Sequence, residues 1–321
     1  MCHMLFRIPH AVVPGWICAA IVAVAAFGAA DAVSATLEVR PALDRCGVAE
    51  AVLHAVPATS AARIPDSQAV KGTSNIAWVW LGSPTSRYPH AALGSSVHAA
   101  SLHVLLAQPD GSQRALSLEL TPNRVIEDRL PRLADLDGDG RDEIILVESD
   151  DKLGSSLVVY GLRLGAGARQ PVLAQLARSP FIGTANRWLN PVGVADFDGD
   201  GRLDIAAVST PHLGGVLTLY RYQPPGLDPV ATAPGFSNHR NGSAEQQLSA
   251  IVNRPGRRPT VILASNDLQT LHAVGIEGLQ GWKAQSAPVR LPAAVRRMTS
   301  QSSGVCVLMM NGATVQVTLG D

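Results

Sequence analysis

Two acidic segments carry the residues of this chain that are best suited to chemistry. The first runs from Asp135 to Glu143 as Asp-Leu-Asp-Gly-Asp-Gly-Arg-Asp-Glu, and the second from Asp196 to Asp204 as Asp-Phe-Asp-Gly-Asp-Gly-Arg-Leu-Asp. Each places carboxylates at positions 1, 3, 5 and 9 of a loop. A hard cation such as Ca²⁺ binds six to eight oxygen atoms at about 2.3–2.6 Å, and carboxylates and backbone carbonyls are its usual protein ligands. The two segments therefore predict two sites for a divalent cation.

The spacing of the acids is suited to a tight loop that surrounds one ion. Alternate side chains in such a loop can point at a common centre, and the glycines at positions 4 and 6 allow the positive φ that folding back requires. Four carboxylates leave little room for a substrate, so we expect about two structural Ca²⁺ ions. The predicted ligands are Asp135, Asp137, Asp139, Glu143 and the backbone carbonyl of Arg141 in the first loop, and Asp196, Asp198, Asp200, Asp204 and the backbone carbonyl of Arg202 in the second.

The segments that follow the acidic loops distinguish them from EF-hands. An EF-hand loop ends in a bidentate Glu at position 12 and continues as a helix. Position 12 here is Leu146 or Ala207, and the runs over 143–147 and 204–208 are short, apolar and largely β-branched. Such runs predict buried strands. An ordinary acidic turn without metal is the alternative, and it is disfavoured because the pattern occurs twice, with the first aspartates 61 residues apart (135 and 196).

These two segments resemble the FG-GAP or VCBS repeat, which occurs in integrin α-subunit propellers and in many secreted bacterial proteins. The repeat pattern, apolar-Ala-Asp-apolar-Asp-Gly-Asp-Gly-x-x-Asp-Ile, matches residues 194–205 almost throughout, and residues 133–144 differ from it by Glu143 at the ninth loop position. The resemblance implies that each repeat is one four-stranded blade of a β-propeller whose acidic loop binds Ca²⁺.

The surrounding sequence predicts four strands per repeat. Each clear copy, about 130–180 and 190–235, has a strand, the acidic loop, a second strand, a third strand that ends in a packing tyrosine (Tyr160 or Tyr220), and a fourth strand. Less distinct copies are expected over about 76–122, 246–290 and 291–321. We therefore expect an all-β fold over 36–321: a β-propeller of about five to seven four-stranded antiparallel blades.

The copy over 246–290 has lost its acidic loop. The corresponding segment is Asn253-Arg254-Pro255-Gly256-Arg257-Arg258, which cannot bind Ca²⁺. One hypothesis is that an arginine of this loop interacts with nearby acids in place of a metal. A solvated basic loop is the alternative.

The N-terminal 35 residues have the composition of a signal peptide. Arg7 gives a short positive region, no charged residue occurs from Ala11 to Ala30, and Val33-Ser34-Ala35 fits a cleavage site. We expect cleavage after Ala35 and a secreted or periplasmic protein. The alternative is a membrane anchor over 11–30, because 20 uncharged residues are long enough to span a bilayer.

Two cysteines remain after such cleavage, Cys46 and Cys306, one near each end of the mature chain. An oxidising compartment permits a disulfide, and a Cys46–Cys306 bond would join the first and last segments of a propeller. Two separate buried thiols are the alternative.

The composition excludes some classes of partner and offers no signature of catalysis. The chain has 321 residues and zero formal net charge, so it lacks the basic balance that nucleic-acid binding requires. It contains no Gly-x-Ser-x-Gly, His-Glu-x-x-His, Cys-x-x-Cys or phosphate-loop motif. We therefore expect an exported, non-enzymatic calcium-binding module for a protein or glycan partner. The alternative is an exported carbohydrate-active enzyme, a lyase or hydrolase, with catalytic groups on the propeller loops.

Overall fold

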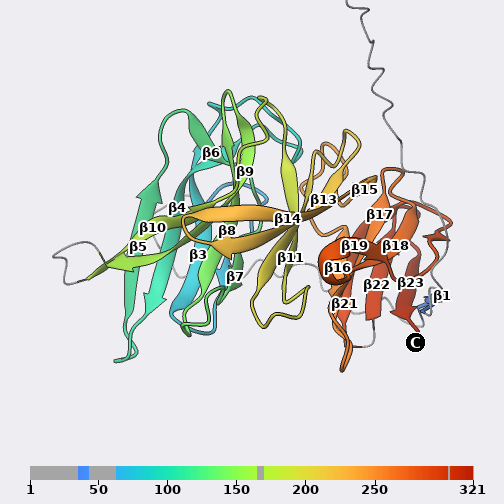
Figure 1. Ribbon diagram of the computed structural model, residues 1–321. Coiled ribbons are helices and arrows are strands. Elements are labelled where there is room, and N and C mark those ends of the chain that lie inside the picture. The colour runs from blue at the N-terminus through green and yellow to red at the C-terminus, as the bar shows by residue number, and fades with distance from the viewer. Residues whose placement is uncertain (1–34, 43–62, 165–169, 303, 321) are drawn as a thin grey trace, which may run out of the picture. The chain divides into compact units, whose positions relative to one another are not determined.

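The computed structural model describes residues 35–42, 63–164, 170–302 and 304–320. They lie in one compact unit, Val33–Asp321. The described residues form twenty-three strands and one 3-10 helix, η1 (Gly278–Gln280), and contain no α-helix (Figure 1). This confirms the predicted all-β class. The proposed signal peptide and anchor lie outside the described residues, apart from Ala35. No helix in the described part is long and apolar enough to cross a bilayer.

Twenty of the strands form five antiparallel groups of four, which we call blades 1 to 5. Blade 1 contains β2 (Val70–Lys71), β3 (Ile76–Thr85), β4 (His98–Ala107) and β5 (Gln113–Glu119); blade 2 contains β7 (Arg132–Ala134), β8 (Glu143–Asp150), β9 (Gly154–Leu164) and β10 (Pro171–Arg178); blade 3 contains β11 (Leu189–Ala195), β12 (Asp204–Ser209), β13 (Val216–Gln223) and β14 (Gly226–Pro234). Blade 4 contains β16 (Ser249–Val252), β17 (Thr260–Ser265), β18 (Thr270–Ile276) and β19 (Trp282–Ala284), and blade 5 contains β21 (Val295–Gln301), β22 (Gly304–Met309), β23 (Thr314–Leu319) and β1 (Leu37–Pro41). Five blades agree with the lower end of the predicted number.

Three short strands lie outside this scheme. β6 (Arg124–Ile126) pairs with both β4 and β8 and so connects the sheets of blades 1 and 2. β15 (Phe236–Ser237) pairs with β17, and β20 (Val289–Arg290) pairs with β18. A single parallel contact between β10 and β14 connects blades 2 and 3.

The last blade is completed by the first strand of the chain. β1 pairs antiparallel with β23 over five residues, from Leu37 opposite Leu319 to Pro41 opposite Val315, and Figure 1 shows the blue β1 beside the red β23. Cys306 of β22 is fully buried and takes part in a disulfide. Cys46 lies outside the described residues, so its pairing with Cys306 stays a prediction.

Apolar side chains pack between successive blades. One buried cluster lies between blades 1 and 2, a second between blades 2 and 3, a third between blades 3 and 4, and a fourth between blades 4 and 5. The inner strands are therefore covered on both faces, and every residue of β8 is buried. The outer strand β5 alternates between exposed and half-buried residues because one face meets solvent. This explains why the segments after the acidic loops are continuously apolar.

Candidate metal centres

The first acidic loop lies between β7 and β8 and is held by its own carboxylates. Asp135 accepts hydrogen bonds from the backbone N–H groups of Asp139 (3.0 Å) and Gly140 (2.9 Å), and Asp137 accepts one from Asp139 (3.2 Å). Gly138 and Gly140 have φ of 76° and 84°, the left-handed region that favours glycine. The loop therefore folds back on itself at the two glycines, as the sequence predicted.

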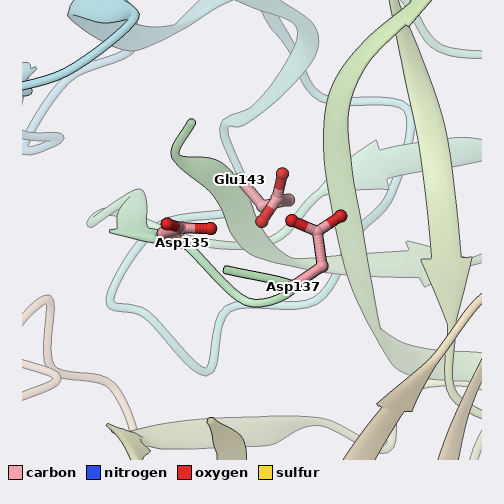
Figure 2. A group of neighbouring side chains, drawn as sticks. All are labelled: Asp135, Asp137 and Glu143. Carbon is pink, nitrogen blue, oxygen red and sulfur yellow. The ribbon is translucent and has the colours of Figure 1, made fainter. Parts of the chain in front are cut away.

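Three carboxylates of this loop lie close together without a cationic partner. Ligand oxygens of Asp135, Asp137 and Glu143 lie within 4.8 Å of one another, and Figure 2 shows the three side chains around a common space. No ion pair involves any of the three among the residues that the structure describes. Asp139 instead pairs with Arg141 of the same loop. The arrangement fits a divalent cation, which would neutralise charges that the protein leaves unbalanced.

Glu143 shows the electrostatic cost of leaving the first loop without a cation. Its side chain is buried, and it accepts a hydrogen bond of 2.8 Å from the Leu136 N–H. Burial is the main reason that its pKa rises to about 7, and repulsion from Asp137, Asp139 and Asp135 raises it further, against the Leu136 hydrogen bond. A bound divalent cation would favour the ionised carboxylate.

The second acidic loop, between β11 and β12, has the same backbone geometry. Asp196 accepts hydrogen bonds from the N–H groups of Gly199 (2.8 Å) and Gly201 (3.0 Å), whose φ values are 76° and 86°. Ligand oxygens of Asp196, Asp198 and Asp200 lie within 4.8 Å of one another. Two acidic clusters of this chain can thus hold a metal ion, as the sequence predicted.

The second loop differs from the first because an arginine lies among its acids. Arg221 of β13 pairs with Asp198, approaches Asp204 with Nε at 3.3 Å from Oδ1, and lies 3.7 Å from Asp200. Asp204 is fully buried and its second oxygen has no hydrogen-bond partner. Burial raises the pKa of Asp204 to about 6, and Arg221 opposes that shift. The guanidinium supplies part of the positive charge that an ion would otherwise provide.

Strand pairing explains why only one loop has this arginine. Asp204 pairs with Arg221 across β12 and β13. In blade 2, Ile144 pairs with Tyr160, so the position equivalent to Arg221 is Gly161. A Cβ atom added to Gly161 would lie 3.6 Å from Cγ of Glu143. No arginine reaches Glu143 from the third strand of blade 2, because the residue at the position of Arg221 is glycine and has no side chain.

The hypothesis that an arginine of the basic loop over 253–258 interacts with nearby acids stays a hypothesis, and the arginine among the acids of the second loop comes from another strand. Arg258 lies against the second loop, where a Cβ added to Gly199 would be 3.0 Å from its Nε, but its Nη1 donates to the Ile276 carbonyl. Arg221 makes the contacts with the acids. A weak signal for Arg221 was present in the sequence, because a charged residue directly follows Tyr220, whereas glycine follows the equivalent Tyr160.

A cluster of one buried and two half-buried histidines was also missed, because its members are far apart in sequence. His212 Nε2 and His239 Nδ1 are 2.8 Å apart, and Trp188 packs on both rings. His90 Nδ1 lies 2.6 Å from Oε1 of the buried Glu127, whose main-chain carbonyl accepts a hydrogen bond from Trp188. Their roles in the described structure are packing and hydrogen bonding.

Acidification is expected to destabilise the protein through His239. Burial lowers its pKa to about 3, and the neighbouring His212 lowers it further. The neutral form is therefore favoured on folding, and stability is lost as the pH falls below 6.5, the pKa in the unfolded chain. From pH 7 to pH 5 the loss is roughly 2 kcal/mol. Urea unfolding at several pH values measures it, and His239→Gln should flatten this dependence; an unchanged slope would contradict it.

The match to a repeat family agrees with this architecture. Four-stranded blades with acidic loops between their first and second strands define a β-propeller built from repeats. Residues 135–207 match the FG-GAP-like repeat, which confirms the resemblance seen in the sequence. No curated protein matches the chain significantly. Among solved structures, the crystal structure of the rhamnogalacturonan lyase YesW is similar with a TM-score of 0.36 and 13% sequence identity. The match covers 80% of this chain and 58% of that chain, so this chain spans less than two thirds of its length.

Proposed function

We propose that this protein is a calcium-binding β-propeller that acts as an exported binding module for a protein or glycan partner. The observation that carries the metal assignment is the group of Asp135, Asp137 and Glu143, whose oxygens lie within 4.8 Å of one another and which form no ion pair with a described residue. Oxygen ligands on a flexible loop are the set that Ca²⁺ prefers. The ion has a structural role, since it joins the loop to the start of β8.

Calcium titration by calorimetry tests this proposal. We expect one tight event at the first loop and a weaker one at the second, because an ion there must displace Arg221 from the carboxylates. Asp137→Ala should remove the tight event, whereas Asp228→Ala, an exposed aspartate outside both loops, should leave it unchanged. Absence of any calcium heat in the wild-type protein would refute the metal assignment.

Replacing Arg221 by glutamine is expected to strengthen the second site. The substitution removes the competing charge while keeping a polar side chain, and the expected gain in calcium affinity is on the order of ten-fold, equivalent to about 1.4 kcal/mol. Calorimetry measures the change. Arg202→Gln is the matched control, because Arg202 is exposed in the same loop and forms no ion pair among the described residues. Equal gains in calcium affinity in both variants would show that the total positive charge near the second loop, and not the contacts of Arg221, sets the affinity of this site.

The choice of partner and compartment has separate support. Zero net charge opposes nucleic-acid binding, and the apolar N-terminal segment supports export, with a membrane anchor over 11–30 as the alternative. Expression in a bacterial host followed by N-terminal sequencing of the periplasmic protein tests this part. Processing after Ala35 would support it, and a protein that keeps residues 11–30 in the membrane fraction would support the anchor.

An exported carbohydrate-active enzyme is the second candidate, and one observation favours it. His90 is hydrogen-bonded to the buried Glu127, an arrangement that orients an imidazole for proton transfer. Incubation with acidic polysaccharides, followed by detection of new unsaturated or reducing ends, tests it. Product that disappears in His90→Gln would establish the enzyme over the binding module.

A further inference from the structure

A cavity of about 950 Å³ lies away from both acidic loops and is lined by five arginines from distant parts of the chain. Arg63 precedes β2, Arg129 lies between β6 and β7, and Arg240 lies between β15 and β16. The other two, Arg296 and Arg297, belong to β21. The chain as a whole is neutral and has 26 lysines and arginines, so five of them around one cavity form a local concentration of positive charge.

Most of this charge lies outside the ion pairs of the described residues, although Asp128, Asp66 and Glu127 lie close enough to interact with the charge of Arg129. Arg297 pairs with Glu245, but Arg63, Arg129, Arg240 and Arg296 form no ion pair with any described residue. Asp66 is the other carboxylate in the described lining. Five guanidinium groups against these two carboxylates leave the described lining with a net charge of +3 (5 − 2), and an excess of one sign in a cavity attracts ligands of the opposite sign.

Arg129 supports the same conclusion because its guanidinium is buried. The residue is only 3% exposed, and its terminal nitrogens donate to the main-chain carbonyls of Asp128 (3.2 Å) and Val97 (3.0 Å). Its Nε has no hydrogen-bond partner. A buried polar atom without a hydrogen-bond partner destabilises the folded protein, and an anionic ligand in the cavity would reduce that cost.

The remaining lining indicates the kind of anion. Leu130, Leu248, Leu308 and Met310 contribute apolar surface, and Met310 is 51% exposed. No Trp, Tyr or Phe is among the described residues that line the cavity, so it lacks the aromatic platforms on which bases stack. Guanidinium groups bind carboxylates with two parallel hydrogen bonds, and methionine adapts to varied aliphatic side chains.

We propose that this cavity binds an acidic peptide segment of a partner protein, with Asp or Glu carboxylates on the arginines and aliphatic side chains on the Leu308 and Met310 surface. This inference deepens the proposed binding function by naming the partner's chemistry. It does not depend on the metal assignment, because none of the cavity residues belongs to either acidic loop.

Selection from a library of random twelve-residue peptides on the purified protein tests the proposal. We expect enrichment of Asp and Glu interspersed with aliphatic residues. Fluorescence anisotropy of the best selected peptide should then show at least ten-fold weaker binding to the double variant Arg240→Gln/Arg296→Gln. Arg257→Gln, an exposed arginine outside the cavity, is the matched control and should bind normally. Replacing the peptide's acids by amides should also abolish binding.

Several outcomes would overturn the proposal. Two of them are a selection without enrichment of Asp and Glu, and equal peptide binding to the wild-type protein and the double variant. The third is displacement of the peptide by oligogalacturonate at a lower concentration than by unlabelled peptide. That result would assign the cavity to an acidic glycan. Calcium calorimetry on the double variant separates the two proposals. If the double variant loses peptide binding but keeps its calcium heat, the result supports the cavity proposal independently of the metal site. If it loses both, the variant is misfolded. Arg240→Lys/Arg296→Lys, which keeps the positive charges, must then restore peptide binding for the proposal to stand.

Discussion

Removing calcium with EGTA is expected to lower the melting temperature by about 4–5 °C. An ion at one hundred times its Kd stabilises the folded state by about 2.7 kcal/mol. For a folded unit of roughly 290 residues the unfolding entropy near the midpoint is about 0.6 kcal/mol/K, which converts that energy into the stated shift. The physical source is relief of the repulsion among Asp135, Asp137 and Glu143, which the protein itself does not neutralise. Thermal scans in excess calcium and in EGTA measure the difference.

The double variant Asp137→Ala/Asp198→Ala should abolish this difference, because each loop then lacks a ligand. Its melting temperature in calcium should equal its melting temperature in EGTA. The control is Asp110→Ala/Asp228→Ala, which removes two exposed aspartates outside both loops and should preserve the full response. A calcium response that survives in the Asp137→Ala/Asp198→Ala variant would mean that the ion binds elsewhere.

Replacing Arg178 by alanine is expected to destabilise the protein by about 3 kcal/mol. Arg178 Nη2 lies 2.5 Å from Oε2 of Glu148, which is 1% exposed, and its Nη1 donates to Ser156 Oγ at 2.6 Å. Burial raises the pKa of Glu148, and Arg178 opposes that shift. Breaking a buried pair by removing one partner costs about 3–5 kcal/mol. The lower figure applies because Tyr160 still donates to Glu148 and Arg124 lies 4.0 Å away.

Equilibrium unfolding in guanidinium chloride measures this loss. Adding Glu148→Gln to the Arg178→Ala variant should recover part of it, because the carboxylate without its partner is then gone. Arg163→Ala is the control, since Arg163 is exposed on β9 and its loss should change stability by less than about 0.5 kcal/mol. A double variant no more stable than Arg178→Ala would contradict this account and indicate that Arg178 acts through packing on Phe181, over whose ring it lies 5.1 Å from the centroid.

Local sequence determined the two acidic loops and the strands around them. The spacing of acids and glycines from Asp135 to Glu143 specifies a turn whose carboxylates accept the loop's own N–H groups, and this geometry is present. The apolar runs after each loop predicted β8 and β12. Pro109-Asp110-Gly111-Ser112, a run of turn-forming residues, connects the paired strands β4 and β5. These features were predictable because each depends on residues within about ten positions of one another.

Only the tertiary structure decided what surrounds those loops. Two nearly identical loops become unequal because strand pairing places Arg221 opposite Asp204 and glycine beside Glu143. The arginine cavity combines residues from Arg63 to Thr314, and the His212–His239 contact joins the β12–β13 turn of blade 3 to the segment between β15 and β16. The physical reason is that electrostatic and packing contacts act through space. Their partners are set by blade packing, and no short-range pattern in the chain encodes which distant side chains will meet.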